Sequence, residues 1–131
     1  MREDMAQIII ERPRHGCRLP TKSKGYDRRT ARLGWDDAVK SEGIKARVVS
    51  LPSWDLFEKQ PQAYRDSVIP PTVTARVCVE MASTFGWERY AGSSGAIIGM
   101  TTYGASAPLK DLLKHFGFTT DAVVAAAKKQ L

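Results

Sequence analysis

The sequence has 131 residues, of which 43% are hydrophobic and 26% are charged, and its formal net charge is +6. This length suits one globular domain, and the composition excludes a chain that is disordered or fibrous throughout. The longest apolar runs, such as Ala122–Ala127, are far shorter than the ~20 residues that span a bilayer, so we expect no membrane attachment and a cytoplasmic location.

The first 35 residues differ from the rest of the chain. Gln7–Glu11 predicts a short strand. Arg12–Arg32 then holds eight Lys or Arg against the single acid Asp27, which gives this stretch a net charge of +7. A helix is predicted from Asp27 through Val39. We therefore divide the chain into a basic N-terminal segment over 1–35, made of a short strand plus a loop, and a domain over 36–131.

Three β-branched runs predict strands in the second part of the chain. They cover Ile44–Ser50, Thr74–Met81 and Gly95–Thr101. The first has adjacent valines, as in a strand buried on both faces, whereas the second alternates apolar residues with others. Helical stretches separate these runs, and this alternation is typical of α/β proteins.

Helices are predicted between and after these strands. Ser53 is a suitable N-cap for a helix over Trp54–Lys59, and Pro61 can open another. Phe85–Tyr90 predicts a short helix or an aromatic loop.

Two helices are predicted at the end of the chain. Leu109–Phe116 places leucines at helical spacing, with Ser106 as its N-cap and Gly117 at its C′ position. Thr119 or Thr120 caps the last helix.

Several sequence blocks in these elements resemble the closing segment of bacterial-type transketolases. The resemblance runs from about Ala38 to Leu131. The blocks are VVSLPSWDLFEKQ, VIPPTVTARVCVE, STFGWERYAG, and GAIIGMTTYGASAP through FGFTTDAVVAAAK. They follow the order of the family, although none of them is itself a catalytic motif.

The resemblance implies an α/β fold with three layers, α/β/α, around a mixed, mostly parallel sheet of five strands. In the family, an apolar strand ahead of the Gly43 region lies inside the sheet, between the strands that correspond to Ile44–Ser50 and Thr74–Met81. Here the Arg-rich stretch stands in its place. The domain therefore either lacks one interior strand or substitutes Gln7–Glu11 for it.

The resemblance also implies a function for the complete family. Transketolases transfer two-carbon ketol units between sugar phosphates, using thiamine diphosphate and a divalent metal, magnesium or calcium. Their cofactor lies between the first domain of one subunit and the middle domain of the other, and it requires a Gly-Asp-Gly-type loop with a downstream Asn. This chain resembles neither domain.

We therefore expect no catalytic, cofactor-binding or metal-binding residue in this chain, and no activity from the chain alone. Its expected role is that of a C-terminal structural and assembly domain, present as a fragment or a fusion. Its expected partners are a second copy of itself or the complementary transketolase domains.

Gly104, Ala105 and Ser106 are a candidate anion site. They join the carboxyl end of a predicted strand to the start of a predicted helix, where backbone N–H groups are free to bind an anion. Helix capping by Ser106 explains the same residues without a ligand.

Aromatic residues are concentrated around two connections. Trp54, Phe85, Trp87 and Tyr90 are either the anchor of an interface or part of the internal packing.

A second function, from a different class, starts from the basic stretch. Arg12–Arg32, with Tyr26 and Trp35, could bind nucleic acid or another polyanion through phosphate contacts and stacking. The chain would then be a small basic binding protein on an α/β scaffold. The competing interpretation is a solvated tail, and a basic face continuous with the folded body would favour binding.

Overall fold

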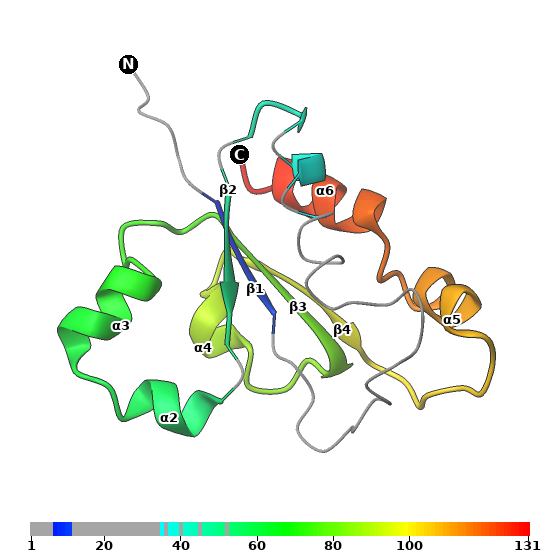
Figure 1. The fold of residues 1–131 in the computed structure, drawn as a ribbon, viewed down its shortest axis with the longest axis horizontal. Coiled ribbons are helices and arrows are strands. Elements are labelled where there is room, and N and C mark those ends of the chain that lie inside the picture. The colour runs from blue at the N-terminus through cyan, green and yellow to red at the C-terminus, as the bar shows by residue number, and fades with distance from the viewer. Residues whose placement is uncertain (1–6, 12–34, 36, 40, 45, 52) are drawn as a thin grey trace.

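The computed structural model describes residues 7–11, 35, 37–39, 41–44, 46–51 and 53–131. Among these described residues, four strands form one sheet (Figure 1) in the order β2-β1-β3-β4, and every pair of neighbours is parallel. Their bounds are β1 (Gln7–Glu11), β2 (Ala46–Ser50), β3 (Arg76–Ser83) and β4 (Ala96–Met100).

The interior position in the sheet is filled by β1. Ile9 pairs with Val48 of β2 on one side and with Val77 of β3 on the other. The prediction that Gln7–Glu11 substitutes for an interior strand is therefore confirmed. Its run of three isoleucines suits this place, because interior parallel strands are apolar on both faces and rich in β-branched residues.

The sheet differs in one respect from the sheet that the resemblance implied. Among the described residues it has four strands, all parallel, rather than five in a mixed arrangement. The stretch over 101–108 that follows β4 forms no strand, and all of its residues are exposed. It lacks apolar alternation and ends at Pro108, which has no N–H to donate to a ladder.

Within the described part of the chain, five labelled helices follow β2. They are α2 (Trp54–Glu58), α3 (Gln62–Val68), α4 (Glu88–Ala91), α5 (Leu109–His115) and α6 (Thr120–Lys128). Residues 35, 37–39 and 41 are helical as well. Within the part of the chain that the structure describes, no helix is long and apolar enough to cross a membrane.

Helix caps follow the predictions in three cases and depart from them in one. Ser53 accepts a hydrogen bond from the Leu56 N–H at 3.3 Å, and Thr119 accepts one from the Ala122 N–H at 3.3 Å. Gly117 has a φ of 76°, which is the left-handed conformation predicted for it. The predicted cap at Ser106 is wrong, because α5 begins after Pro108 and has no side-chain cap.

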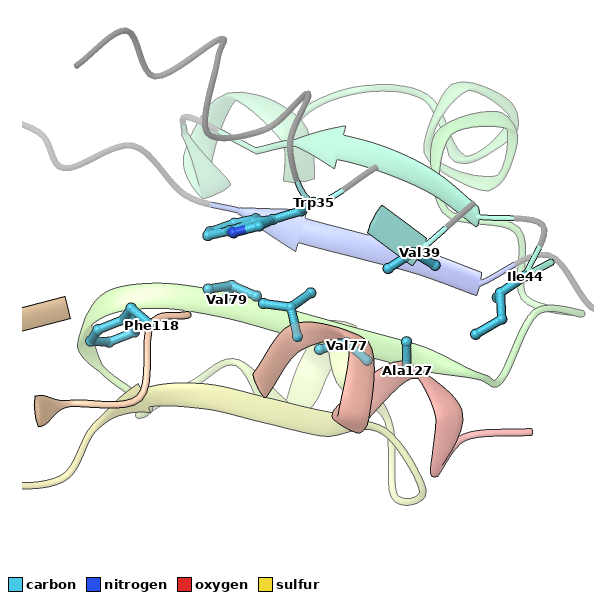
Figure 2. Close-up of a cluster of buried hydrophobic side chains, with 8 residues drawn as sticks. Trp35, Val39, Ile44, Val77, Val79, Phe118 and Ala127 are labelled. Atoms are coloured by element: carbon cyan, nitrogen blue, oxygen red, sulfur yellow. The ribbon is translucent and has the colours of Figure 1, made fainter. Parts of the chain in front are cut away.

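Two buried clusters pack against the two faces of the sheet. Successive residues of β3 alternate between them, since side chains of a strand point to opposite faces. Val77 and Val79 belong to the α6-side core (Figure 2), whereas Cys78 belongs to the α4-side core. This is the three-layer arrangement that the resemblance implied.

The two clusters differ in composition. The α6-side core consists of Trp35, Val39, Ile44, Val77, Val79, Phe118, Val123 and Ala127. The α4-side core consists of Val49, Leu51, Ile69, Cys78, Trp87, Tyr90 and Ala91. An ion pair from Lys128 of α6 to Glu42, at 2.6 Å, also ties the C-terminal helix to the residues ahead of β2.

Candidate interface at the carboxyl edge of the sheet

Exposed aromatic side chains follow two neighbouring strands at the edge where these strands end. Ser83 of β3 pairs with Met100 of β4, so the two connections leave the sheet side by side. Phe85 in the first connection is 87% exposed, and Tyr103 in the second is 98% exposed. Such side chains at the carboxyl edge of a parallel sheet are candidates for contact with a ligand or a partner.

The turn that carries Phe85 is fixed by its neighbours. The Ser83 hydroxyl accepts a hydrogen bond from the Phe85 N–H at 3.2 Å. Gly86 has a φ of 84°, and a Cβ at this position would lie 3.0 Å from the Trp54 ring. Because only glycine adopts this conformation readily and leaves room for Trp54, the turn holds Phe85 away from the core.

The four aromatic residues predicted as an interface do not share one environment. Trp87 and Tyr90 are 1% and 4% exposed, and both belong to the α4-side core. The Trp54 ring packs edge-on against Trp87 with centroids 5.1 Å apart, and the Arg89 guanidinium lies 5.2 Å from the Trp54 centroid. The structure therefore places Trp87 and Tyr90 in internal packing, Trp54 at the margin of the core, and Phe85 on the surface.

A polar network behind this edge joins three helices. The Tyr90 hydroxyl donates a hydrogen bond to Oε1 of Glu58 at 2.8 Å, and the Arg65 guanidinium binds Oε2 at 2.7 Å. Burial, and next the Glu58 carboxylate, raise the pKa of Tyr90. Sequence reasoning missed this network, because the partners of Glu58 come from different helices.

Arg76 is a second structural residue that sequence reasoning missed. Its guanidinium donates to the carbonyls of Val73 at 2.7 Å, Pro70 at 2.8 Å and Tyr90 at 2.8 Å. Desolvation lowers its pKa. Arg76 thereby holds the connection before β3 against the end of α4.

Gly104, Ala105 and Ser106 lie in the exposed stretch next to Tyr103. Helix α5 starts three residues after Ser106 and has only seven residues. The hydroxyl of Ser106 does not cap it, so the anion site stays a prediction that rests on the sequence.

The described residues offer no place for the cofactor of the implied family. No group of three His, Cys, Asp or Glu side chains among them could hold a metal ion. The whole sequence also contains no Asn and no Gly-Asp-Gly. The metal that accompanies thiamine diphosphate therefore finds no ligand group among the described residues.

The residues predicted for nucleic-acid binding fall mostly outside the described part of the chain, as Arg12–Arg32 and Tyr26 do. Trp35 is described, and it is 5% exposed in the α6-side core. Its ring is therefore not available to stack on a base, which removes one of the two aromatics on which that hypothesis relied.

Comparisons with known proteins agree with the geometry. A family model described as the transketolase-like TK C-terminal domain matches residues 32–119. Transketolase 1 of Escherichia coli (strain K12) is 56% identical over 95 residues, which cover 72% of this chain and 14% of that protein. The chain thus spans about one seventh of the length of such a curated relative.

Two solved structures extend the comparison. A transketolase from Pichia stipitis superposes with a TM-score of 0.73 and 29% identity, over 99% of this chain and 17% of that chain. A split-gene transketolase, described as an inactive beta4 tetramer, superposes with a TM-score of 0.52 over 98% of this chain and 39% of its own. Its identity is 21%, so that likeness concerns the fold alone.

Proposed function

Because the chain belongs to the transketolase C-terminal domain family, we propose that it is the structural and assembly domain of a thiamine diphosphate-dependent transketolase. The match of residues 32–119 to this domain carries the proposal. Ketol transfer between sugar phosphates would then require the cofactor-binding domains, to which this chain docks in the cytoplasm. No cofactor is assigned to this chain in the proposal.

The carboxyl edge of the sheet supports docking. Phe85 and Tyr103 expose two aromatic side chains there, and the whole stretch 101–110 is exposed. Aromatic side chains on a rigid turn are typical anchors of protein interfaces, because they bury a large area and lose little rotamer freedom. The split-gene neighbour is a precedent for a transketolase that is divided between chains.

The experiment that tests the proposal uses an E. coli transketolase truncated before its C-terminal domain. The full 131-residue chain is co-expressed with it, and co-purification and ketol transfer with thiamine diphosphate and magnesium are measured. We expect the pair to co-purify and the chain alone to show no turnover. Turnover by the chain alone, in material free of host transketolase, would contradict the proposal.

Matched variants locate the docking surface. Phe85→Ser with Tyr103→Ser should weaken co-purification about tenfold or more, which is the effect of losing two interface anchors. Leu56→Ser is the control, because Leu56 is 64% exposed but lies on α2. Equal loss with both sets, or none with either, would show that this edge is not the docking surface.

A further inference from the structure

Strand β1 is interior in the sheet but far in sequence from the rest of the domain. It ends at Glu11, and the next described residue is Trp35, so 23 residues connect them. The family match begins at residue 32 and does not include β1. The sheet is therefore completed by a strand from outside the matched domain.

The two strands on either side of the slot that β1 occupies are also tied to the segment that connects them, through hydrogen bonds in which β1 takes no part. Arg47 of β2 donates hydrogen bonds to the carbonyls of Ser67 and Val68, at the end of α3. Arg76 of β3 donates hydrogen bonds to Pro70 and Val73, in the connection that comes from α3. The slot therefore has structural support that is independent of which chain supplies the strand.

The pairing of β1 with its two neighbouring strands is given by its register. Five residue pairs join β1 to β2, from Gln7 with Ala46 to Glu11 with Ser50, and four join it to β3. A second copy of the chain carries the same strand and can form the same ladders. Exchange would keep every backbone hydrogen bond of the slot, so its free-energy cost is mainly that of association.

The length of the connection permits exchange. A chain of 23 residues spans up to roughly 75 to 83 Å when it is extended. This exceeds the radius of gyration of a domain of this size, about 14 Å, several times. The β1 of a second copy must compete with the chain's own β1 for the place between β2 and β3. A connection of this length gives the chain's own β1 an effective concentration on the order of 1 mM.

We propose that the slot between β2 and β3 is a strand-acceptor site that takes β1 from a second copy of this chain, so that two copies exchange β1 and form a homodimer. The site is formed by backbone groups of Ala46–Ser50 and Arg76–Val79. Monomer predominates at micromolar concentration, and the dimer forms as the concentration approaches the effective concentration of the tethered strand. The proposal stands independently of the proposed function.

Ile10 provides the test, because its register partner on β3 is the native Cys78. One full-length copy carries Cys17→Ser, Ile10→Cys and Cys78→Ala, and the other carries Cys17→Ser alone. Only a strand inserted in trans can place the new cysteine of the first copy beside Cys78 of the second. Cys78 is fully buried, so a cysteine on the surface of another molecule cannot reach it in the folded chain.

The two copies are mixed, unfolded and refolded together, oxidised, and separated on a non-reducing gel. We expect the mixed disulfide dimer to increase at least tenfold between about 10 µM and about 1 mM protein. A single chain with Cys17→Ser and Ile10→Cys, which retains Cys78, should form the internal disulfide at every concentration. If this internal bond forms while no mixed dimer appears at the highest concentration, the proposal is overturned.

A second pair guards against a variant that does not fold. Val49 is the partner of Ile10 on the β2 side, so the second copy can carry Val49→Cys, Cys17→Ser and Cys78→Ala instead. Mixed dimer with either acceptor copy supports exchange. Absence of both internal disulfides in the single-chain versions of the two pairs would show that β1 does not occupy this register, and would overturn the proposal as well.

Discussion

Strand β1 and helix α5 differ in how well the local sequence pattern indicates the importance of the element in the fold. The pattern is weak for β1, which is central, and strong for α5, which is peripheral. Gln7–Glu11 is short, lies near the chain terminus and is bracketed by polar residues, yet it pairs on both sides in the middle of the sheet. Leu109–His115 has leucines at helical spacing and a glycine at its end, yet none of its residues is buried. The local sequence pattern therefore predicts that an element forms. How much the element contributes to the stability of the fold depends on its place relative to the sheet.

The physical reason is the number of partners that each element satisfies. Strand β1 supplies backbone donors and acceptors to two neighbouring strands, so its removal leaves two rows of polar groups without a ladder. The backbone hydrogen bonds of helix α5 stay within the helix and its two ends, such as the bond from the Leu112 N–H to the Pro108 carbonyl at 3.1 Å. From this region, Leu113 and Phe116 pack against the margin of the α6-side core. The next four predictions test how much depends on the sheet around β1 and how much on the helices at the end of the chain.

The largest effect is expected from Ile9→Pro. Proline removes an N–H and distorts a strand that is paired on both sides, so the free energy of unfolding should fall by about 3 kcal/mol or more. Urea denaturation measures this loss, and amide exchange in β3 should become faster. Lys110→Pro in the first turn of α5 is the control and should cost less than half as much, because the first turn of a helix tolerates proline. Equal losses would show that the two regions contribute alike.

Cys78 reports on the same region through pH. Its ordinary pKa of 9 is raised to about 12, because β3 is buried in the sheet. Below pH 9 both states hold the thiol proton. Between pH 9 and 12 the unfolded chain loses it while the folded chain keeps it, so stability falls as pH rises.

The expected loss is roughly 1 kcal/mol per pH unit inside this window. Urea titrations from pH 8 to 11, with Cys78→Ala for comparison, measure it. The variant should lose stability less steeply, and the difference should shrink in the Ile9→Pro background, where the cover from β1 is weakened. If the free energy of unfolding falls equally steeply with pH in the wild type and in Cys78→Ala, burial does not raise the pKa of Cys78 as proposed.

Two truncations of apolar side chains compare the sheet with the helix more gently. Val77 is fully buried beside β1, so Val77→Ala should cost about 2 kcal/mol. Leu109 is 46% exposed at the start of α5, and Leu109→Ala should cost under about 1 kcal/mol. Thermal unfolding followed by circular dichroism separates the two, and a reversed order would contradict the assignment of α5 to the periphery.

The smallest effect is expected from Ser106→Ala. Since α5 begins after Pro108 without a side-chain cap, this substitution should change the free energy of unfolding by less than about 0.5 kcal/mol. Thr119→Ala is the matched control, because the Thr119 hydroxyl accepts a hydrogen bond from the Ala122 N–H and its loss should cost about 1 kcal/mol. A cost for Ser106→Ala as large as for Thr119→Ala would restore the predicted cap.

The sequence predicted the type of nearly every element, because strand and helix patterns are local. The strand predicted at Ile44–Ser50 begins at Ala46, and the one predicted at Thr74–Met81 covers Arg76–Ser83. Such shifts arise because the ends of a strand depend on its partners. The place of β1 was predictable only through the resemblance, which indicated an interior position that needed a strand.

The candidate site was less predictable. Sequence grouped Trp54, Phe85, Trp87 and Tyr90, and the structure divides them between core and surface. No local pattern distinguishes Phe85 from Trp87, since the left-handed turn at Gly86 between them decides which side chain faces inward. Tyr103 was not singled out, and the sequence signal that could have found it was its place two residues after the strand predicted at Gly95–Thr101.

The order of the strands in the sheet also means that β1 is synthesised long before one of the two strands with which it pairs. Strand β1 is made first, but its second neighbour, β3, ends 72 residues later, at Ser83. At about 5 to 20 residues per second, this interval lasts roughly 4 to 15 s. During that time the apolar segment with three isoleucines lacks one of its two strand partners. Unpaired apolar strand segments of this kind are prone to aggregate. Synthesis in the cell should therefore depend on chaperones that bind the nascent N-terminal segment.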